Sequence, residues 1–311
     1  MEKLFHPDKR EQWKEIFFRR VMPALTLLAL AVGALAAWWA FRMFSRPARS
    51  GEARELFHGV HYERTVSDVP RRVTVHKVRI DLDAGGIGFV VTPGDVSGGK
   101  EIPARTTSAF LNEFDAQVAI NAAFFEPFHS NHPLDYYPEP GEAVDVLGRA
   151  VAEGELYSED NQDWPTLCLS SNRVEIALGE LPVGVRWAVA GRHLLVDQGE
   201  AVEAKGDAFN VELHPRTAVG VDERGRTLWL VVVDGRQKNY SEGATLKELA
   251  ALMVHLGAWR ALNLDGGGSS TLVIEAEGGE AGVLNAPYHT RVPMRERPVA
   301  NHVGVYAKPV E

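Results

Sequence analysis

The chain has 311 residues, enough for one large domain or two small ones, and its 45% hydrophobic and 24% charged residues are typical of a globular protein. The net charge of −9 is uneven: residues 1–54 carry ten Lys or Arg against five Asp or Glu, which leaves a net of −14 for the remainder. Such an acidic body argues against nonspecific nucleic-acid binding, which depends on neutralising phosphates. The single cysteine, Cys168, excludes an internal disulfide, and its apolar neighbours predict a buried side chain.

Residues 21–44 are predicted to form a transmembrane anchor. Val21 to Phe41 runs for 21 residues without a charge, which makes a helix of about 32 Å, long enough to cross a bilayer. Six Lys or Arg precede this run and four follow it up to Arg54. The slight N-terminal excess favours a cytoplasmic tail at residues 1–20 and a body that is periplasmic or extracellular. The alternative is a cleaved signal peptide, because Ala34-Leu35-Ala36 resembles a cleavage site.

The remaining chain is predicted to form a charged linker at 45–56 and one domain at 57–311. Alternating residues at 72–82 and 87–92 predict two strands joined as a hairpin through Gly85-Gly86. The segment 126–163 has no strong periodicity, and a segment of that kind inside a compact domain is usually functional or mobile. Further strands are expected at 117–120, 166–169, 174–178, 187–189, 194–196, 218–221, 227–233, 260–264 and 303–307.

Two helices are predicted in the body. A short one at 107–114 begins with a threonine cap. A longer one follows Thr245, where Glu248 completes a capping box and apolar residues line one face. Gly257 supplies its left-handed stop.

The strand at 260–264 delivers Asp265 to a turn of three glycines, which is followed by Ser269 and Ser270. Consecutive glycines permit positive φ and close approach by another group, and the N–H groups of such a turn can form an anion-binding nest. The turn is not a Walker A loop, because no Gly-Lys-Ser/Thr follows it. A carboxylate, amide donors and two hydroxyls suit the hydrolysis of an anionic ester. The alternative is an ordinary glycine-rich hairpin turn.

Asp234 and Asp265 lie 31 residues apart, and each ends an apolar strand with one amphipathic helix between them. A strand–helix–strand crossover makes the two strands parallel, so both carboxylates are expected at one edge of the sheet. Paired carboxylates suit hydrolysis of a glycosidic bond. A phosphodiester also needs arginine near its oxygens. The candidates are Arg216 and Arg236, next to strand ends, and then Arg291, Arg295 and Arg297.

With these residues assembled, the chain resembles the phosphodiester glycosidase family, and in particular its bacterial envelope members. The resemblance implies an α/β fold of mixed α+β type, with a largely mixed β-sheet core, at least one βαβ crossover and a few helices. It departs from the family at Ala122-Ala123, where the family usually has glycine and where the added methyls are expected either to narrow the pocket or to change the backbone. The matching runs, in the order of the family, are Val118–Phe125, His214–Gly220, Val232–Arg236 with Ser241–Gly243, Asn263–Ser270 and Arg297–Gly304.

The resemblance also implies a site and an activity, hydrolysis of a sugar-1-phosphodiester in envelope or extracellular glycans without a cofactor. Asp265 is expected to act as general acid/base or nucleophile at the anomeric carbon, and Asp234 as second carboxylate or orienting group. Arg216 is expected to bind phosphoryl oxygens, and Asn121 to hydrogen-bond sugar hydroxyls or phosphate. The expected substrate-binding residues are Gly266, Gly267, Gly268, Ser269, Ser270, Ser241, Arg236 and Asn301.

Two other functions stay open from the sequence. A metal-dependent phosphodiesterase could use His129, His132 and Asp135, although two histidines in a proline-rich loop are a weak signal. A non-catalytic envelope protein could bind a phosphoglycan through aromatic residues that equally suit a core. The expected partners are a carbohydrate phosphodiester and, through the N-terminal helix, a membrane. No feature indicates nucleic acid, and none indicates an oligomeric state.

Overall fold

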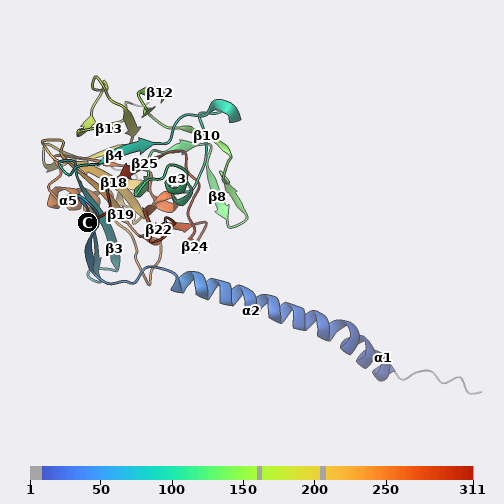
Figure 1. Cartoon of the computed structure of the whole chain (residues 1–311). Helices are drawn as coiled ribbons and strands as arrows, with labels where there is room; N and C mark the ends of the chain where they lie inside the picture. Colours follow the sequence, from blue (N-terminus) through green and yellow to red (C-terminus); the bar gives the residue numbers. More distant parts are fainter. Residues whose placement is uncertain (1–8, 160–162, 204–207, 311) are drawn as a thin grey trace, which may run out of the picture. The chain divides into compact units, whose positions relative to one another are not determined.

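The computed structural model describes residues 9–159, 163–203 and 208–310, and the chain divides into two compact units, Met1–Arg46 and Pro47–Glu311 (Figure 1). The first unit is helical and contains α1 (Lys9–Ile16), the π-helical stretch η1 (Phe17–Val21) and α2 (Met22–Phe44). Its segment Gln12–Phe44 is long and apolar enough to cross a membrane, by length and composition, a property that anchors share with signal sequences. The predicted tail is therefore helical from residue 9 onward, and its first eight residues lie outside the described part.

The second unit contains an eight-stranded sheet with the strand order β1-β2-β3-β19-β18-β20-β16-β17. All neighbours in this sheet are antiparallel. β19 and β20 therefore run in the same direction on either side of β18, and they end at one edge of the sheet, as predicted. The strands are β1 (Glu52–Phe57), β2 (Val60–Ser67), β3 (Val73–Asp81), β16 (His193–Asp197), β17 (Glu200–Ala201), β18 (Arg216–Val221), β19 (Thr227–Val233) and β20 (Arg260–Asn263).

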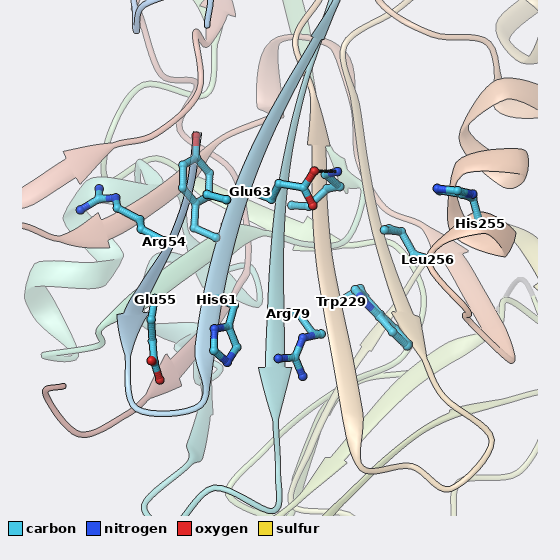
Figure 2. A pocket seen from close by; sticks show the side chains of 11 residues that line it. Arg54, Glu55, His61, Glu63, Arg79, Trp229, His255 and Leu256 are labelled. Atoms are coloured by element: carbon cyan, nitrogen blue, oxygen red, sulfur yellow. Dashed lines mark ion pairs between the residues drawn. The ribbon is translucent and has the colours of Figure 1, made fainter. Parts of the chain in front are cut away.

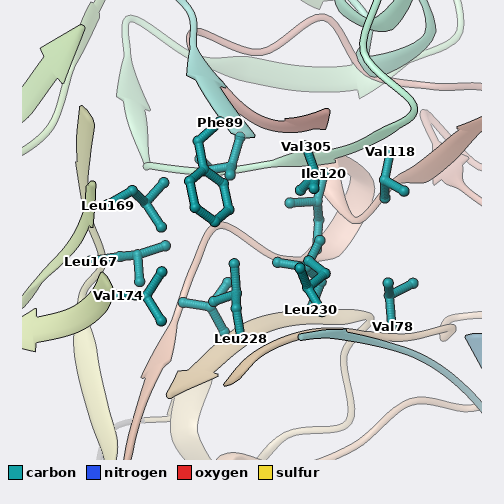
Figure 3. Close-up of a cluster of buried hydrophobic side chains, with 14 of the residues drawn as sticks. Val78, Phe89, Val118, Ile120, Leu167, Leu169, Val174, Leu228, Leu230 and Val305 are labelled. Carbon is teal, nitrogen blue, oxygen red and sulfur yellow. The ribbon is translucent and has the colours of Figure 1, made fainter. Parts of the chain in front are cut away.

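Two five-stranded sheets share one hydrophobic core with the large sheet. Figure 3 shows Leu228 and Leu230 of the large sheet, Ile120 of the first small sheet, and Leu167 and Leu169 of the second in this core. The first small sheet contains β22 (Ala281–Val283), β21 (Leu272–Glu275), β6 (Val118–Asn121), β25 (His302–Tyr306) and β4 (Gly88–Val91) in that order. The second contains β12 (Glu155–Ser158), β11 (Ala150–Ala152), β15 (Trp187–Ala190), β13 (Thr166–Ser170) and β14 (Arg173–Ala177).

The helix α5 (Leu246–His255) connects β19 to β20 and packs on the large sheet. Its predicted capping box is present, with reciprocal hydrogen bonds between Thr245 and Glu248. Leu249 and Met253 are fully buried against residues of the large sheet, and such burial stabilises a fold by about 1.5–3 kcal/mol for each side chain. Because α5 is held in this way, the crossover fixes where β19 and β20 end relative to one another.

Smaller elements surround these sheets. The helix α3 (Thr107–Glu113) is capped by the side chain of Thr106, which accepts the N–H of Ala109. The other elements are η2 (Val96–Gly98), α4 (Ala208–Val211), the three-stranded sheet of β5 (Ile102–Pro103), β10 (Ala143–Val146) and β7 (Phe125–Glu126), the hairpin of β8 (His129–His132) and β9 (Asp135–Tyr137), and the pair β23 (Tyr288–His289) and β24 (Val292–Pro293).

The mainly β core with few helices and one crossover is confirmed, whereas some local predictions are wrong. The strands predicted at 72–82 and 87–92 form no hairpin, because β3 pairs with β2 and β19 whereas β4 pairs with β25 in another sheet. The sequence of a glycine turn does not show whether the following strand pairs with the preceding strand or enters a different sheet. The segment 126–163 holds short strands from β7 to β12. Part of the predicted linker 45–56 is the exposed edge strand β1, whose charged residues hide its β pattern.

Candidate active site

A cavity of about 420 Å³ lies where β19 and β20 end. Asp265, Gly266 and Gly267, which follow β20, line it together with Arg236, which follows β19. A second arginine, Arg297, completes the polar part of the lining. The rest of the lining is an aromatic wall formed by Phe124, Phe125 and Phe128, together with Ser130. An aromatic wall beside a few convergent charged groups is the usual composition of a small-molecule site.

The residues that line this cavity all belong to the described part of the chain, and Asp265 is the only one of them with a carboxyl group. Its side chain is only 9% exposed, and its Oδ2 accepts a hydrogen bond of 2.5 Å from the hydroxyl of Ser269. Burial raises the pKa of Asp265 to about 6, against the lowering effects of Arg297, Ser269 and Arg236. A carboxyl group with a pKa near neutrality can both take up and release a proton at working pH.

Two arginines bring positive charge to the same cavity. Arg297 is 8% exposed; its Nη1 donates to Ser269 Oγ over 3.0 Å, and its guanidinium lies 4.3 Å from the centre of the Phe128 ring. Arg236 Nη2 lies 3.3 Å from His214 Nδ1. Burial lowers the pKa of Arg297 to about 10 and also lowers the pKa of Arg236. At a pKa of about 10, Arg297 stays cationic at neutral pH.

The glycine turn allows these arginines to approach the backbone. η3 (Gly267–Ser269) is a single helical turn, and Gly267 has a φ of +63°. A Cβ atom on Gly267 would lie 3.1 Å from the guanidinium nitrogens of Arg236, and one on Gly268 would lie 2.5 Å from Arg297 Nη2. The amide of Gly267 donates to the carbonyl of Pro215. The turn thus seats two guanidinium groups, which bring positive charge to the cavity, whereas the amide of Gly267 is already bonded within the protein.

Asp234 lies at the neighbouring strand end, as predicted, but its carboxylate does not line the cavity. One oxygen, Oδ2, lies 2.9 Å from His76 Nε2. The other, Oδ1, accepts hydrogen bonds from Asn285 Nδ2 (3.1 Å) and from the N–H of Ala286 (2.8 Å). Asn285 in turn donates to the carbonyl of Ser270, directly after the glycine turn. These contacts support the orienting role expected for Asp234 rather than contact with a substrate.

Asp234→Asn is expected to lower the free energy of unfolding by about 2–4 kcal/mol, because the amide presents a donor to groups that already donate. The change is measured by thermal melting of the full-length chain in detergent. The pH dependence of any remaining activity should match that of the wild type, since Asp265 is unchanged. A displaced pH profile would instead show that the Asp234 side chain influences the ionisation that controls turnover.

Arg216, the expected phosphate ligand, is also outside the cavity lining. It begins β18 and is fully buried. Its Nε donates to the carbonyl of Ala244 over 2.9 Å, and its Nη2 donates to the carbonyl of Glu212 over 3.0 Å. The side chain therefore holds backbone segments together, and the cations that face the cavity are Arg236 and Arg297.

The two asparagines make hydrogen bonds to the backbone, Asn121 at Asp265 and Asn301 at Ala123. Asn121 Nδ2 donates to the carbonyl of Asp265 over 2.7 Å. Asn301 Oδ1 accepts the N–H of Ala123 over 2.8 Å. Ala123 and its neighbour Ala122 are buried in hydrophobic clusters outside the cavity lining, so their methyl groups do not narrow it. The hydroxyls of Ser241 and Ser270 also make hydrogen bonds within the protein.

Sequence reasoning named none of the phenylalanines in the cavity lining, nor Ser130, as a site residue. Phe128 and Ser130 come from the segment that showed no periodicity, and only Phe124-Phe125, placed directly after a buried strand, gave a signal. The residues of the metal hypothesis lie on the β8–β9 hairpin, where His129 Nε2 is 3.1 Å from Asp135 Oδ1. Across the described residues, no group of three or more His, Cys, Asp or Glu side chains could hold a metal ion.

A larger cavity, of about 600 Å³, lies elsewhere on the large sheet (Figure 2). Its side chains come from β1, β2, β3, β19 and the end of α5. Charges of both signs line it, and Glu63 pairs with Lys77 at 2.7 Å. No site residue predicted from the sequence lines this cavity. The smaller cavity, with its buried acid between arginines, is therefore the candidate active site.

A mainly β domain with a buried carboxyl group facing two arginines is suited to an enzyme that acts on an anionic substrate. A family model described as phosphodiester glycosidase matches residues 114–306, which include Asp265, Arg236 and Arg297, and the chain belongs to this family. The resemblance inferred from the sequence is thereby confirmed.

Curated relatives and solved structures agree with this assignment. The N-acetylglucosamine-1-phosphodiester alpha-N-acetylglucosaminidase of Homo sapiens is 30% identical over 200 residues, which cover 60% of this chain and 37% of that protein. The Bos taurus protein of the same name is 32% identical over 102 residues, covering 30% of this chain and 19% of that protein. The chain thus spans well under half the length of these relatives.

The similar solved structures show the fold. A hypothetical protein from Synechocystis has a TM-score of 0.63 at 16% identity, covering 84% of this chain and 64% of that one. The zebrafish N-acetylglucosamine-1-phosphodiester alpha-N-acetylglucosaminidase catalytic domain, auto-inhibited by its pro-peptide, has a TM-score of 0.59 at 18% identity, covering 86% and 93%. A Burkholderia pseudomallei protein described as exported has a TM-score of 0.55 at 15% identity, covering 84% and 97%.

Proposed function

We propose that this chain hydrolyses a sugar-1-phosphodiester at the bond between the anomeric carbon and the phosphate oxygen. The observation that carries the proposal is the buried carboxyl group of Asp265 in one cavity with Arg236 and Arg297. Membership of the phosphodiester glycosidase family and the names of the curated relatives support the same substrate class.

The lining of the cavity suggests how such a substrate is held. The phenylalanines offer apolar faces to the carbon–hydrogen face of a sugar ring. Arg236 and Arg297 converge near the glycine turn, where they can hold the phosphoryl oxygens through charged hydrogen bonds. In this arrangement Asp265 faces the anomeric carbon, and the phosphate leaves on the arginine side.

One carboxylate in the cavity is enough for this leaving group. Glycosidases ordinarily use two carboxyl groups, one to protonate the leaving oxygen and one as nucleophile or base. A phosphomonoester is a weak base, so its departure needs charge stabilisation more than a proton, and Arg236 and Arg297 supply that charge. Asp265 then acts as nucleophile or as base for water. Overall, the sugar gains the hydroxyl of water and the phosphomonoester gains its proton.

We further propose that the N-terminal helix anchors the protein in a membrane, with the N-terminus cytoplasmic and the catalytic domain periplasmic or extracellular. Support comes from the apolar segment Gln12–Phe44 and from a structural neighbour described as exported. Envelope glycans would then be the accessible substrates. N-terminal sequencing of the mature protein tests the anchor, because a start beyond Ala36 would instead show a cleaved signal peptide.

The proposed chemistry is tested with the full-length chain in detergent and the methyl phosphodiester of N-acetylglucosamine 1-phosphate, in oxygen-18 water. The label is expected in the sugar product, since the bond from carbon to oxygen breaks. kcat/KM should increase with pH through about 6, as Asp265 ionises, and then level off. Label in the phosphate product, or no turnover across a panel of sugar-1-phosphodiesters, would refute the proposal.

A further inference from the structure

A second cavity of about 420 Å³ adjoins the candidate active site. The two cavities share Ser130, Arg236 and Arg297, so the two arginines stand between them. Asp265 lines only the first cavity, whereas Arg291 lines only the second. The lining of the second cavity, which consists of described residues, holds three arginines and no Asp or Glu. This concentration of positive charge is local, because the chain as a whole carries a net charge of −9.

Arg291 is held in the second cavity by an unusual turn. Thr290 and Arg291 form the two-residue connection between β23 and β24, with φ values of +50° and +64°. Two successive positive φ values are typical of hairpin turns that prefer Asn or Gly. An arginine in this left-handed backbone conformation is strained, and backbone strain of this kind is concentrated at functional sites.

Arg291 also differs from its neighbour Arg295 in its contacts. Arg295 Nη1 donates to Thr290 Oγ1 (2.9 Å) and to the carbonyl of Pro133 (3.0 Å), and its guanidinium lies over the ring of Tyr136. Arg291 is exposed and makes no ion pair with any residue that the structure describes. Its charge therefore stays available to a ligand in the second cavity.

We propose that the second cavity is a subsite for an aglycone that carries its own anionic group, a phosphate or a carboxylate, which Arg291 binds. The inference rests on the proposed function, because it places the reacting phosphoryl group between Arg236 and Arg297. Those two cations already exceed the single charge of a phosphodiester, so a third one beyond them matches a second charge on the substrate. The substrate class is a glycan whose sugar-phosphate units repeat, or one whose next unit is an acidic sugar.

The test compares three substrates that share the same sugar-1-phosphodiester and differ only in the aglycone: a neutral hexose, the same hexose with a 6-phosphate, and the corresponding uronate. For the full-length wild type in detergent, kcat/KM is expected to be about five- to tenfold higher for a charged aglycone than for the neutral one. A comparison of kcat/KM between the 6-phosphate and the uronate substrates shows whether the second cavity prefers a phosphate or a carboxylate.

The key variant is Arg291→Asn, because asparagine tolerates the left-handed conformation and removes only the charge. It should lose the preference for the charged aglycone and keep the kcat/KM of the neutral substrate within about twofold. Arg224→Asn, on an exposed turn outside both cavities, makes the same change in net charge and should keep the preference.

The remaining outcomes overturn the inference in distinguishable ways. Equal kcat/KM for all three aglycones, or a preference that survives Arg291→Asn, would refute the subsite while the proposed hydrolysis stands. An equal loss for charged and neutral substrates would assign Arg291 to the reacting phosphate and refute the subsite as well. No hydrolysis of any of the three would refute the proposed function and the subsite together.

Discussion

Replacing Asp265 with Asn is expected to abolish turnover while leaving the protein folded. The amide cannot act as nucleophile or as base, and removal of such a group lowers kcat by about 10³-fold or more. The side chain keeps its shape and its oxygen, so it can still accept the hydroxyl of Ser269. The measurement is kcat for the variant and the wild type on the same sugar-1-phosphodiester, together with a thermal melt of each protein. Retained activity would remove Asp265 from the mechanism.

Asp265→Asn is also expected to make the folded protein more stable above pH 6. Burial raises the pKa of Asp265 from 3.8 to about 6, so the folded state binds this proton more tightly than the unfolded state. The buried charge therefore costs about 3 kcal/mol above pH 6 and nothing below pH 3.8. Asp265→Asn should melt at a higher temperature than the wild type at pH 8, and the difference should vanish near pH 4. A lower melting temperature at pH 8 would contradict the assigned burial.

The sequence predicted where the strands end better than where their side chains point. Asp234 and Asp265 reach one edge of the sheet because the apolar face of α5 and its caps are local patterns that fix the crossover. Whether each carboxylate faces the cavity depends on residues far along the chain. His76 lies 158 residues from Asp234, and periodicity near Asp234 contains no information about it.

The arginines also show that the sequence predicts the end of a strand better than the direction of a side chain. Arg216 and Arg236 both flank strand ends, and the position of each in the sequence predicts a phosphate ligand. The structure separates them by backbone conformation and packing: Arg216 begins β18 and its side chain is buried against carbonyls, whereas Arg236 has a φ of +60° and its guanidinium lies against Gly267. A positive φ at a non-glycine residue cannot be predicted from the residue type, because it is imposed by the surrounding fold.

Two further residues of the cavity lining could not be predicted for a different reason. Phe128 and Ser130 lie in a region of strands only two to four residues long, from β7 to β12. Strands of this length are too short to show an alternating pattern. Their positions are set by pairing with each other and by contacts such as that of Arg297 with Phe128.

A second pair of variants distinguishes an arginine that lines the cavity, Arg297, from the buried Arg216. Arg297→Lys is expected to lower kcat/KM by about 100-fold with little change in melting temperature, because lysine keeps the charge but loses the fork that grips phosphoryl oxygens. Arg216→Met is expected to do the opposite. It leaves the carbonyls of Ala244 and Glu212 without their buried donor, which should lower the free energy of unfolding by about 2–4 kcal/mol.

Both variants are assayed at pH 7.5, above the pKa of Asp265, and at a temperature well below the melting point of Arg216→Met. Under these conditions the folded Arg216→Met protein should keep its kcat/KM within about threefold of the wild type, because its altered side chain touches no substrate. If Arg216→Met instead loses activity 100-fold while folded, and Arg297→Lys stays active, then the phosphate binds at Arg216. The cavity between Arg236 and Arg297 would then not be the site of hydrolysis, since its charge would be dispensable for the reaction.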